Sequence, residues 1–359
     1  MFRHRTHNNH GVALIITLSV VTIVVATALE LNRKVRFSTL ATETTCNRST
    51  LSHMAASGIH VAMAMLVKDR MASTIDSVQE DWANSEKIQG VLMDIPFEQG
   101  KLHVTIADEM AKIQLNSLVY WNGPNTFQFN ESQHQLWSRF LDLILSKEES
   151  LQETEAPMII NSIKDWLDSG DDDAITGLNG AESDYYEALD PPYTCKNDRF
   201  AHISELLLVR GVTPELFIPL GGTQGLSSFL TVYGLKAMDN NAFAFEGKIN
   251  INTADLPVLS AILPEGYSEL APVIYEFRIE KSASEFLHDL SNPSWYKNAP
   301  GCGDIEIDPN LITTSSDIFR IDARASLDEV EITVVAIVHR EIIPETGKWT
   351  CKVLHWQAG

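Results

Sequence analysis

The chain has 359 residues, of which 44% are hydrophobic, so it can bury a sizeable core in about two domains. Its formal net charge of −21 argues against nucleic acid as a partner, because phosphates are bound by clustered Lys and Arg. The charge suits a solvated surface outside the cytoplasm, or cation binding. The sequence has no G-x-S-x-G or H-E-x-x-H motif, and its carboxylates form no recognisable catalytic pair. We therefore expect that it is not an enzyme.

An uncharged apolar run from Val12 to Leu29 follows a basic leader. As a helix it would be about 27 Å long, nearly enough to cross a hydrocarbon core of about 30 Å. Ala26 to Ala28 imitates the cleavage site of a secretory signal peptide, so ordinary secretion is one interpretation. The leader, however, ends in Gly11 immediately before the run, which resembles a type IV prepilin signal. That resemblance implies cleavage after Gly11 by a prepilin peptidase, and a methylated mature chain that starts at Val12.

A long helix is predicted to continue out of this run. No proline occurs from Leu31 to about Arg70, and apolar residues recur at helical spacing in the second half of that stretch. Gly58 should weaken the helix by about 1 kcal/mol relative to Ala. The pattern is typical of the N-terminal spine of a pilin, and a membrane anchor followed by a coiled stalk is the alternative.

Strands are predicted near both ends of the rest of the chain. Leu102, Val104 and Ile106 alternate with polar residues as in a half-buried strand, and residues 112–118 are expected to return as a second strand. Residues 318–342 and 348–357 also read as strands, whereas helical signals occur near residues 135–149, 159–169, 203–211 and 254–263. The end strands are too few to form a separate sheet. We therefore expect an α+β fold in which a helical domain is inserted into a sheet domain.

Three segments carry a second resemblance. Residues 164–193, "KDWLDSGDDDAITGLNGAESDYYEALDPPY", resemble the acidic centre of the α-domain in K-type minor pseudopilins of type II secretion systems (GspK family). Residues 203–217 and 248–263 resemble the two helix-hairpin-helix-like units of that domain. Ile16 stands at the fifth mature position, where most prepilin-like proteins have a glutamate that this family lacks. The resemblance implies a pilin-like fold, with a long N-terminal helix on an antiparallel β-sheet and a large inserted α-helical domain.

The resemblance also implies an organisation and a function. It implies a leader at residues 1–11, the spine helix and first strands at 12–111, the α-domain at 112–312, and the last pilin strands at 313–359. The protein would sit at the tip of the pseudopilus with the I- and J-type minor pseudopilins, initiating or capping assembly for protein export. It would cross the inner membrane once, with its C-terminal domain in the periplasm. A membrane-anchored, calcium-dependent periplasmic binding protein unrelated to secretion is the alternative.

Ile16 is the expected determinant of the tip position. A carboxylate buried among fibre helices needs a partner, and the usual one is the N-terminal amine of the subunit above. A subunit with Ile16 has no carboxylate to pair with that amine. It can therefore start a fibre, but it cannot easily add beneath another subunit. The alternative is that Ile16 is one more lipid-facing residue.

The acidic segment is a candidate calcium site. Calcium takes six to eight oxygen ligands in flexible geometry, and glycines let backbone carbonyls turn inward. Ile175 and Thr176 stand where an EF-hand needs an acceptor and a glycine, so the segment is not an EF-hand. A solvated acidic loop is the alternative, but the α-domain of the GspK family binds Ca²⁺, which favours calcium. The candidate ligands are the carboxylates of Asp168, Asp171, Asp172, Asp173, Glu182 and Asp184.

The four cysteines would lie in an oxidising compartment beyond a membrane anchor. They are Cys46, Cys195, Cys302 and Cys351, and they allow three complete connectivities. A bridge from Cys195 to Cys302 would join the start of the α-domain to its end and is our candidate disulfide.

The two helix-hairpin-helix-like units raise the question of DNA binding. Such units bind DNA backbone through a Gly-x-Gly hairpin, but "RGVTPE" lacks the second glycine and "LPEGYSE" contains Glu265. We expect no nucleic acid partner. Asn252 or Thr253 is expected to cap the helix after the second motif.

Overall fold

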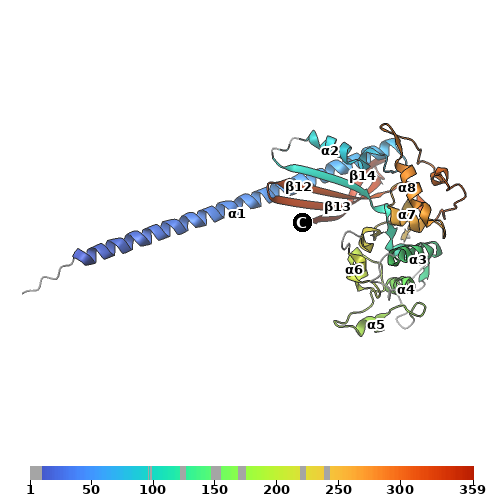
Figure 1. The fold of residues 1–359 in the computed structure, drawn as a ribbon, viewed down its shortest axis with the longest axis horizontal. Coiled ribbons are helices and arrows are strands. Elements are labelled where there is room, and N and C mark those ends of the chain that lie inside the picture. The colour runs from blue at the N-terminus through green and yellow to red at the C-terminus, as the bar shows by residue number, and fades with distance from the viewer. Residues whose placement is uncertain are drawn as a thin grey trace, which may run out of the picture.

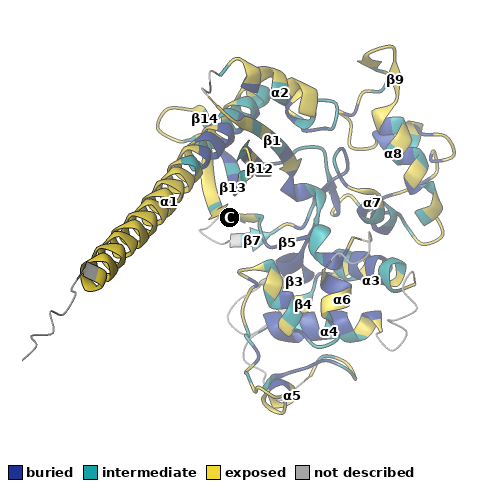
Figure 2. Ribbon diagram, turned by 60° about the vertical axis from the view of Figure 1, so that its left-hand side comes forward, coloured by how far each residue is buried: buried dark blue, intermediate teal, exposed yellow. Residues whose placement is uncertain are grey.

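The computed structural model describes residues 10–95, 97, 99–121, 127–146, 155–168, 175–218, 224–237 and 243–359. Helix α1 (His10–Ala72) is one 63-residue helix whose first part projects from the body of the molecule (Figure 1). Residues 11–50 are almost all exposed, and burial begins at Leu51 (Figure 2). The predicted long helix is therefore confirmed, and it is continuous with the apolar run.

The second half of α1 packs on a four-stranded antiparallel sheet. The strands are β1 (Lys101–Asp108), β12 (Ile318–Leu327), β13 (Val330–Ile343) and β14 (Lys348–Ala358), in that spatial order. Ile321, Ala323 and Ala325 alternate with more exposed residues along β12 and are fully buried. Helix α2 (Ser85–Met93) packs beside β1 and is capped by Asn84, whose side chain accepts from two backbone N–H groups. This arrangement confirms the pilin-like fold.

Gly58 lies where α1 packs closely on β1. A Cβ atom at this position would be 2.8 Å from Val104 Cγ2 and 3.2 Å from Leu102 Cδ2. The glycine that weakens the helix locally therefore permits the close packing of α1 on β1.

The insert runs between the end of β1 and the start of β12 and lies beside the sheet (Figure 1). It has its own hydrophobic core. Its helices are α3 (Glu131–Leu145), α4 (Ala156–Leu167), α5 (Ser183–Glu187), α6 (Pro214–Phe217), α7 (Leu256–Ile262) and α8 (Ala271–Ile279). Its paired short strands are β2 (Ile113–Gln114) with β5 (Leu230–Thr231), β3 (Val119–Trp121) with β4 (Phe127–Phe129), β6 (Leu235–Ala237) with β7 (Phe243–Phe245), β8 (Ile249–Asn250) with β11 (Ile312–Thr313), and β9 (Lys281–Ser282) with β10 (Glu285–Phe286). The predicted domain boundary after residue 312 falls inside β11.

Two local predictions are wrong. Residues 112–118 do not return along β1: β2 pairs in parallel with β5, and a 3₁₀ helix follows, in which Gln114 Oε1 accepts from Ser117 N. Residues 203–208, where the sequence carries a helical signal, do form a helix, which is of the 3₁₀ type and is closed by a capping box between His202 and Glu205. Helix α7 begins after Asp255, so neither Asn252 nor Thr253 caps it.

A buried polar network joins the insert to the sheet where β1 ends. Asp108 Oδ2 accepts from Asn250 Nδ2 at 2.8 Å, and from Thr253 Oγ1 and Ser316 Oγ at 2.5 Å. Its other oxygen accepts from Met110 N at 2.8 Å. Because these donors come from distant parts of the insert, Asp108 fixes both of its ends against the sheet.

Candidate functional site

The acidic site begins at the C-terminal end of α4. Asp165, in the last turn, is a fully buried residue, and its two carboxylate oxygens accept from the backbone. Oδ1 accepts from Thr176 N at 2.9 Å, and Oδ2 accepts from Ala181 N at 2.7 Å. Asp165 thereby holds the returning part of the acidic segment against the helix. Burial raises the pKa of Asp165, and these hydrogen bonds oppose that rise.

Gly180 is required at the closest point of this return. A Cβ atom there would lie 2.1 Å from Asp165 Oδ2 and 2.7 Å from the carbonyl oxygen of Thr176. Arg210 Nη1 donates to the carbonyl of Gly180 at 3.0 Å, so a more distant part of the insert also supports the turn.

Three carboxylates converge beside α4. Oxygens of Asp165, Asp168 and Glu182 all lie within 4.8 Å of one another, and Glu182 is 2% exposed. Lys164 Nζ lies 2.5 Å from Asp168 Oδ2 and 2.9 Å from Thr176 Oγ1. Lys164 thus pairs with Asp168, one of the three carboxylates.

This donor set fits a hard divalent cation. It consists of carboxylate oxygens, and calcium is bound by carboxylate and carbonyl oxygens in flexible geometry. Asp168 and Glu182 are suited to direct ligation. Asp165 already accepts backbone hydrogen bonds with both oxygens, which suits it to orienting the loop around an ion.

The structure brings together only part of the predicted ligand set. Asp168 and Glu182 belong to the group, whereas Asp184 is exposed in the first turn of α5 and is not among the converging carboxylates. Asp171, Asp172 and Asp173 lie outside the described residues. Asp165 was not among the predicted ligands, although it stands only three residues before Asp168, the C-cap of α4.

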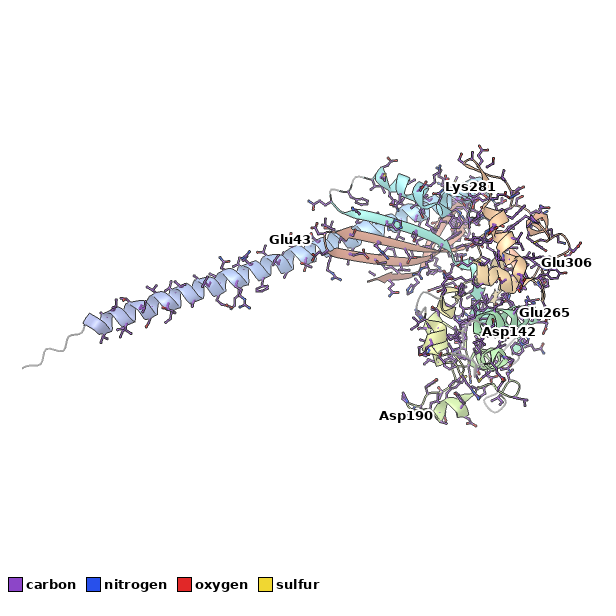
Figure 3. All side chains as sticks on the ribbon, in the orientation of Figure 1. Glu43, Asp142, Asp190, Glu265, Lys281 and Glu306 are labelled. Atoms are coloured by element: carbon purple, nitrogen blue, oxygen red, sulfur yellow. The ribbon has the colours of Figure 1, made fainter. Side chains whose placement is uncertain are left out.

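Aromatic side chains pack together beside this site, on α4, on α5 and in the segment that follows α5. Tyr186 stacks on Tyr193 at a centroid distance of 5.2 Å, and Trp166 meets Tyr186 edge-on at 5.4 Å. The "DPPY" segment thus packs its tyrosine against the segment that carries Glu182. Figure 3 places Asp190, at the start of that segment, at the outer end of the insert.

The candidate disulfide between Cys195 and Cys302 is not formed in the structure, which has all four cysteines as free thiols. Cys195 Sγ contacts the carbonyl of Asp165 at 3.5 Å, and Cys302 Sγ contacts that of Pro300 at 3.7 Å. Each thiol is thus held in a different part of the insert. Burial raises the pKa of Cys195 to about 12, so this thiol is poorly suited to act as a thiolate.

The predicted processing residues lie in the first turns of α1. Gly11 and Val12 follow the start of the helix at His10, and Ile16 lies less than two turns further on with 57% of its surface exposed. The helix contains an 18-residue window of mean hydropathy 2.7, apolar enough to cross a membrane. This agrees with a single-pass anchor.

Comparison with known proteins points to one family. The family description "Type II secretion system (T2SS), protein K" matches residues 111–232, which contain the acidic site. Proteins named type II secretion system protein K are 26% identical over 212 residues in Aeromonas hydrophila and 26% identical over 262 residues in Pseudomonas aeruginosa. The first match covers 58% of this chain and 61% of the relative, and the second covers 70% and 68%.

The chain is thus similar to type II secretion system protein K, most clearly over residues 111–232. A third relative, from Pectobacterium carotovorum subsp. carotovorum, is 35% identical over 115 residues, which is 31% of this chain and 30% of that protein. The matched segment thus spans about three fifths or less of several protein K relatives.

The similarity of fold extends beyond the matched sequence. A crystal structure of the GspK-GspI-GspJ complex from enterotoxigenic Escherichia coli contains a chain that superposes with a TM-score of 0.59 at 19% identity. The superposition covers 89% of this chain and 99% of that one. The fold similarity therefore extends well beyond residues 111–232.

Proposed function

We propose that this chain is a minor pseudopilin at the tip of the type II secretion pseudopilus, where it initiates or caps assembly. The observation that carries the proposal is the combination of an apolar helix continuous with a pilin-like sheet and an insert that matches protein K. The family is a component of a secretion machine, in keeping with a role that is not enzymatic. None of the relatives favours the alternative of a binding protein unrelated to secretion.

The proposed partners are the I- and J-type minor pseudopilins. The support comes from the similar fold of a chain in the GspK-GspI-GspJ complex. Affinity purification of the full-length protein from its native membranes in mild detergent should recover two smaller prepilin-like proteins in stable proportion. Recovery of an unrelated soluble protein, with no prepilin-like partner, would instead favour the alternative function.

We also propose that prepilin peptidase cleaves the chain after Gly11, and that the mature protein spans the inner membrane with its body in the periplasm. The support is the position of Gly11 immediately before the apolar part of α1. Mass spectrometry should find a mature N-terminus at Val12. Cleavage after Ala28 or an intact Met1 would refute this processing.

Ile16 is proposed to restrict the protein to the fibre tip. Its exposed, uncharged side chain cannot pair with the N-terminal amine of a subunit above it. Gold labelling of the protein should therefore mark one end of purified pseudopili. Labels distributed along the shaft of wild-type fibres would refute the tip assignment, whatever an Ile16→Glu variant does.

Calcium is proposed to occupy the acidic site of the insert, with Asp168 and Glu182 as ligands and Asp165 orienting the loop. The support is the convergence of hard oxygen donors from three carboxylates beside α4. The ion would offset repulsion among these carboxylates and fix the acidic segment against α4.

A further inference from the structure

The exposed stretch of α1 between the apolar run and the body carries a group of basic residues. Arg33, Lys34 and Arg36 lie just beyond Leu29, the end of that run. We call these three residues the basic collar. Among the described residues, none of the three pairs with a carboxylate, and the one contact of the collar is Arg33 over the ring of Phe37 at 5.6 Å.

The depth of the collar matches the headgroup layer of a bilayer. At about 1.5 Å per helical residue, Arg33 lies about 6 Å and Arg36 about 10 Å beyond Leu29 along the helix axis. Hydrocarbon and headgroup regions together are about 40–45 Å thick, against about 30 Å for hydrocarbon alone, which leaves about 5–8 Å of headgroup on each side. Long basic side chains reach several ångströms along a helix, so all three charges can lie among headgroups.

The charge of the collar is opposite to that of the body. Residues 51–359 carry 21 Lys and Arg against 46 Asp and Glu. The first buried residue of the body, Leu51, lies about 22 Å beyond Arg36 along α1, which exceeds two Debye lengths of about 8 Å. The charges of the body therefore do not neutralise the basic collar, and the body does not compete with the collar for an anionic surface. Figure 3 shows Glu43 on the exposed part of α1, between the collar and the body.

The arrangement of the collar around α1 favours lipid over a neighbouring helix. At about 100° per residue, the three side chains spread over an arc of about 160°. One packed helix presents a narrow seam and cannot face all three, whereas headgroups surround a helix at this depth.

We propose that the basic collar binds anionic phospholipid headgroups in the leaflet on the side of the body. This proposal rests on α1 crossing a membrane, which belongs to the proposed function. The collar would set the depth of α1 in the bilayer and hold the acidic body away from the membrane surface.

The test uses the full chain reconstituted in phosphatidylcholine bilayers with trace spin-labelled phosphatidylglycerol or phosphatidylcholine. Electron paramagnetic resonance gives the fraction of each lipid that is immobilised at the protein. We expect a preference of about fivefold for phosphatidylglycerol at about 0.15 M salt. At about 1 M salt the preference should fall toward one.

Two matched variants locate the effect. The collar variant Arg33→Gln, Lys34→Gln, Arg36→Gln should lose the preference. The control variant Arg48→Gln, Lys348→Gln, Lys352→Gln removes the same charge from exposed positions further from the membrane and should retain it.

Several results would overturn the proposal. Equal immobilisation of both lipids by the wild-type protein, or a preference that survives in the collar variant, would show that the collar does not select lipid. Loss of co-purifying pseudopilins in the collar variant, with no lipid preference in the wild type, would assign the collar to protein contacts. If an alkaline wash removes the wild-type chain from the vesicles, membrane insertion itself fails, and the collar proposal fails with it.

Discussion

Arg340 and Asp76 form an ion pair that no solvent reaches: Arg340 Nη2 lies 2.6 Å from Asp76 Oδ1, and both side chains are 0% exposed. The same guanidinium donates to the carbonyl of Leu66 in α1 at 3.1 Å and to that of Ser316, at the end of the insert, at 2.8 Å. Arg340 itself lies on β13. One side chain therefore connects the spine helix, the insert and the sheet.

Replacing Arg340 with Met should lower the free energy of unfolding by about 3–5 kcal/mol, because it leaves the buried Asp76 with only the more distant Arg70, 3.8 Å away, as a cation. Chemical unfolding of the full-length protein in detergent, followed by near-UV circular dichroism, measures the change. Arg324→Met is the control, since Arg324 and Glu331 form an exposed pair whose loss should cost about 1 kcal/mol or less. If both variants are equally stable, Arg340 does not hold these segments together.

Stability should fall as pH rises from 5 to 8. Burial raises the pKa of Asp69 to about 7, helped by the charges of Glu80 and Asp76 and opposed by Arg340. Burial likewise raises the pKa of Asp108 to about 6. The folded chain binds these protons more tightly than the unfolded chain, whose carboxyl pKa is near 3.8. The stabilisation that the two bound protons give the folded state is fully present below about pH 4 and is lost as the pH rises through 6 and 7.

The melting temperature measured between pH 5 and pH 8 tests this dependence. Asp69→Asn should flatten the profile, because an amide does not titrate. Asp94→Asn, at an exposed position after α2, should leave it unchanged. A wild-type profile that rises over this range would contradict the raised pKa values.

Calcium should raise the melting temperature of the full-length protein relative to chelator. A ligand that binds only the folded state raises the free energy of unfolding by about 2.7 kcal/mol when its concentration is 100 times its Kd. Asp168→Asn and Glu182→Gln should each reduce this response, whereas Asp184→Asn should retain it because Asp184 lies outside the converging group. An identical melting temperature in calcium and in chelator would exclude a calcium site. A calcium response that is lost only in Asp184→Asn would place the site at Asp184 instead.

Two glycines in helices should respond to alanine with opposite signs. Gly58→Ala should destabilise the protein by about 1–3 kcal/mol, because the new Cβ would meet Val104 Cγ2 at 2.8 Å. Gly90→Ala, in α2, has nothing within 4 Å of the new atom and should stabilise by up to about 1 kcal/mol through helix propensity. Denaturant midpoints of the two variants test this pair, and stabilisation by Gly58→Ala would show that the sheet can move away.

The elements with long, regular patterns were predictable from sequence. The apolar run and helical spacing predicted α1, and the alternation of Leu102, Val104 and Ile106 predicted β1. The segment at 112–118 has a similar alternation but forms a 3₁₀ turn, because Gln114 bonds to Ser117 and its short strand pairs with β5. The local alternation of apolar and polar residues does not indicate which strand a segment will pair with.

Residues that act through long-range contacts were not predictable. Asn252 resembles a helix cap, but its amide oxygen accepts from Trp295 Nε1 at 2.7 Å and is thereby committed elsewhere. Asp165 was overlooked because its partners, Thr176 and Ala181, reach it only after the chain turns back. The pairing of Asp76 with Arg340 likewise joins positions 264 residues apart in the sequence.

The insert leaves and rejoins the sheet at neighbouring positions. Asp108, the last residue of β1, is the register partner of Phe319 in β12, and the four strands follow one another in space in chain order. Topologically, the sheet is a meander in which one hairpin loop has grown into a domain. Such a loop can lengthen, shorten or diverge without altering strand order, so the pilin scaffold and its appendage can evolve at separate rates.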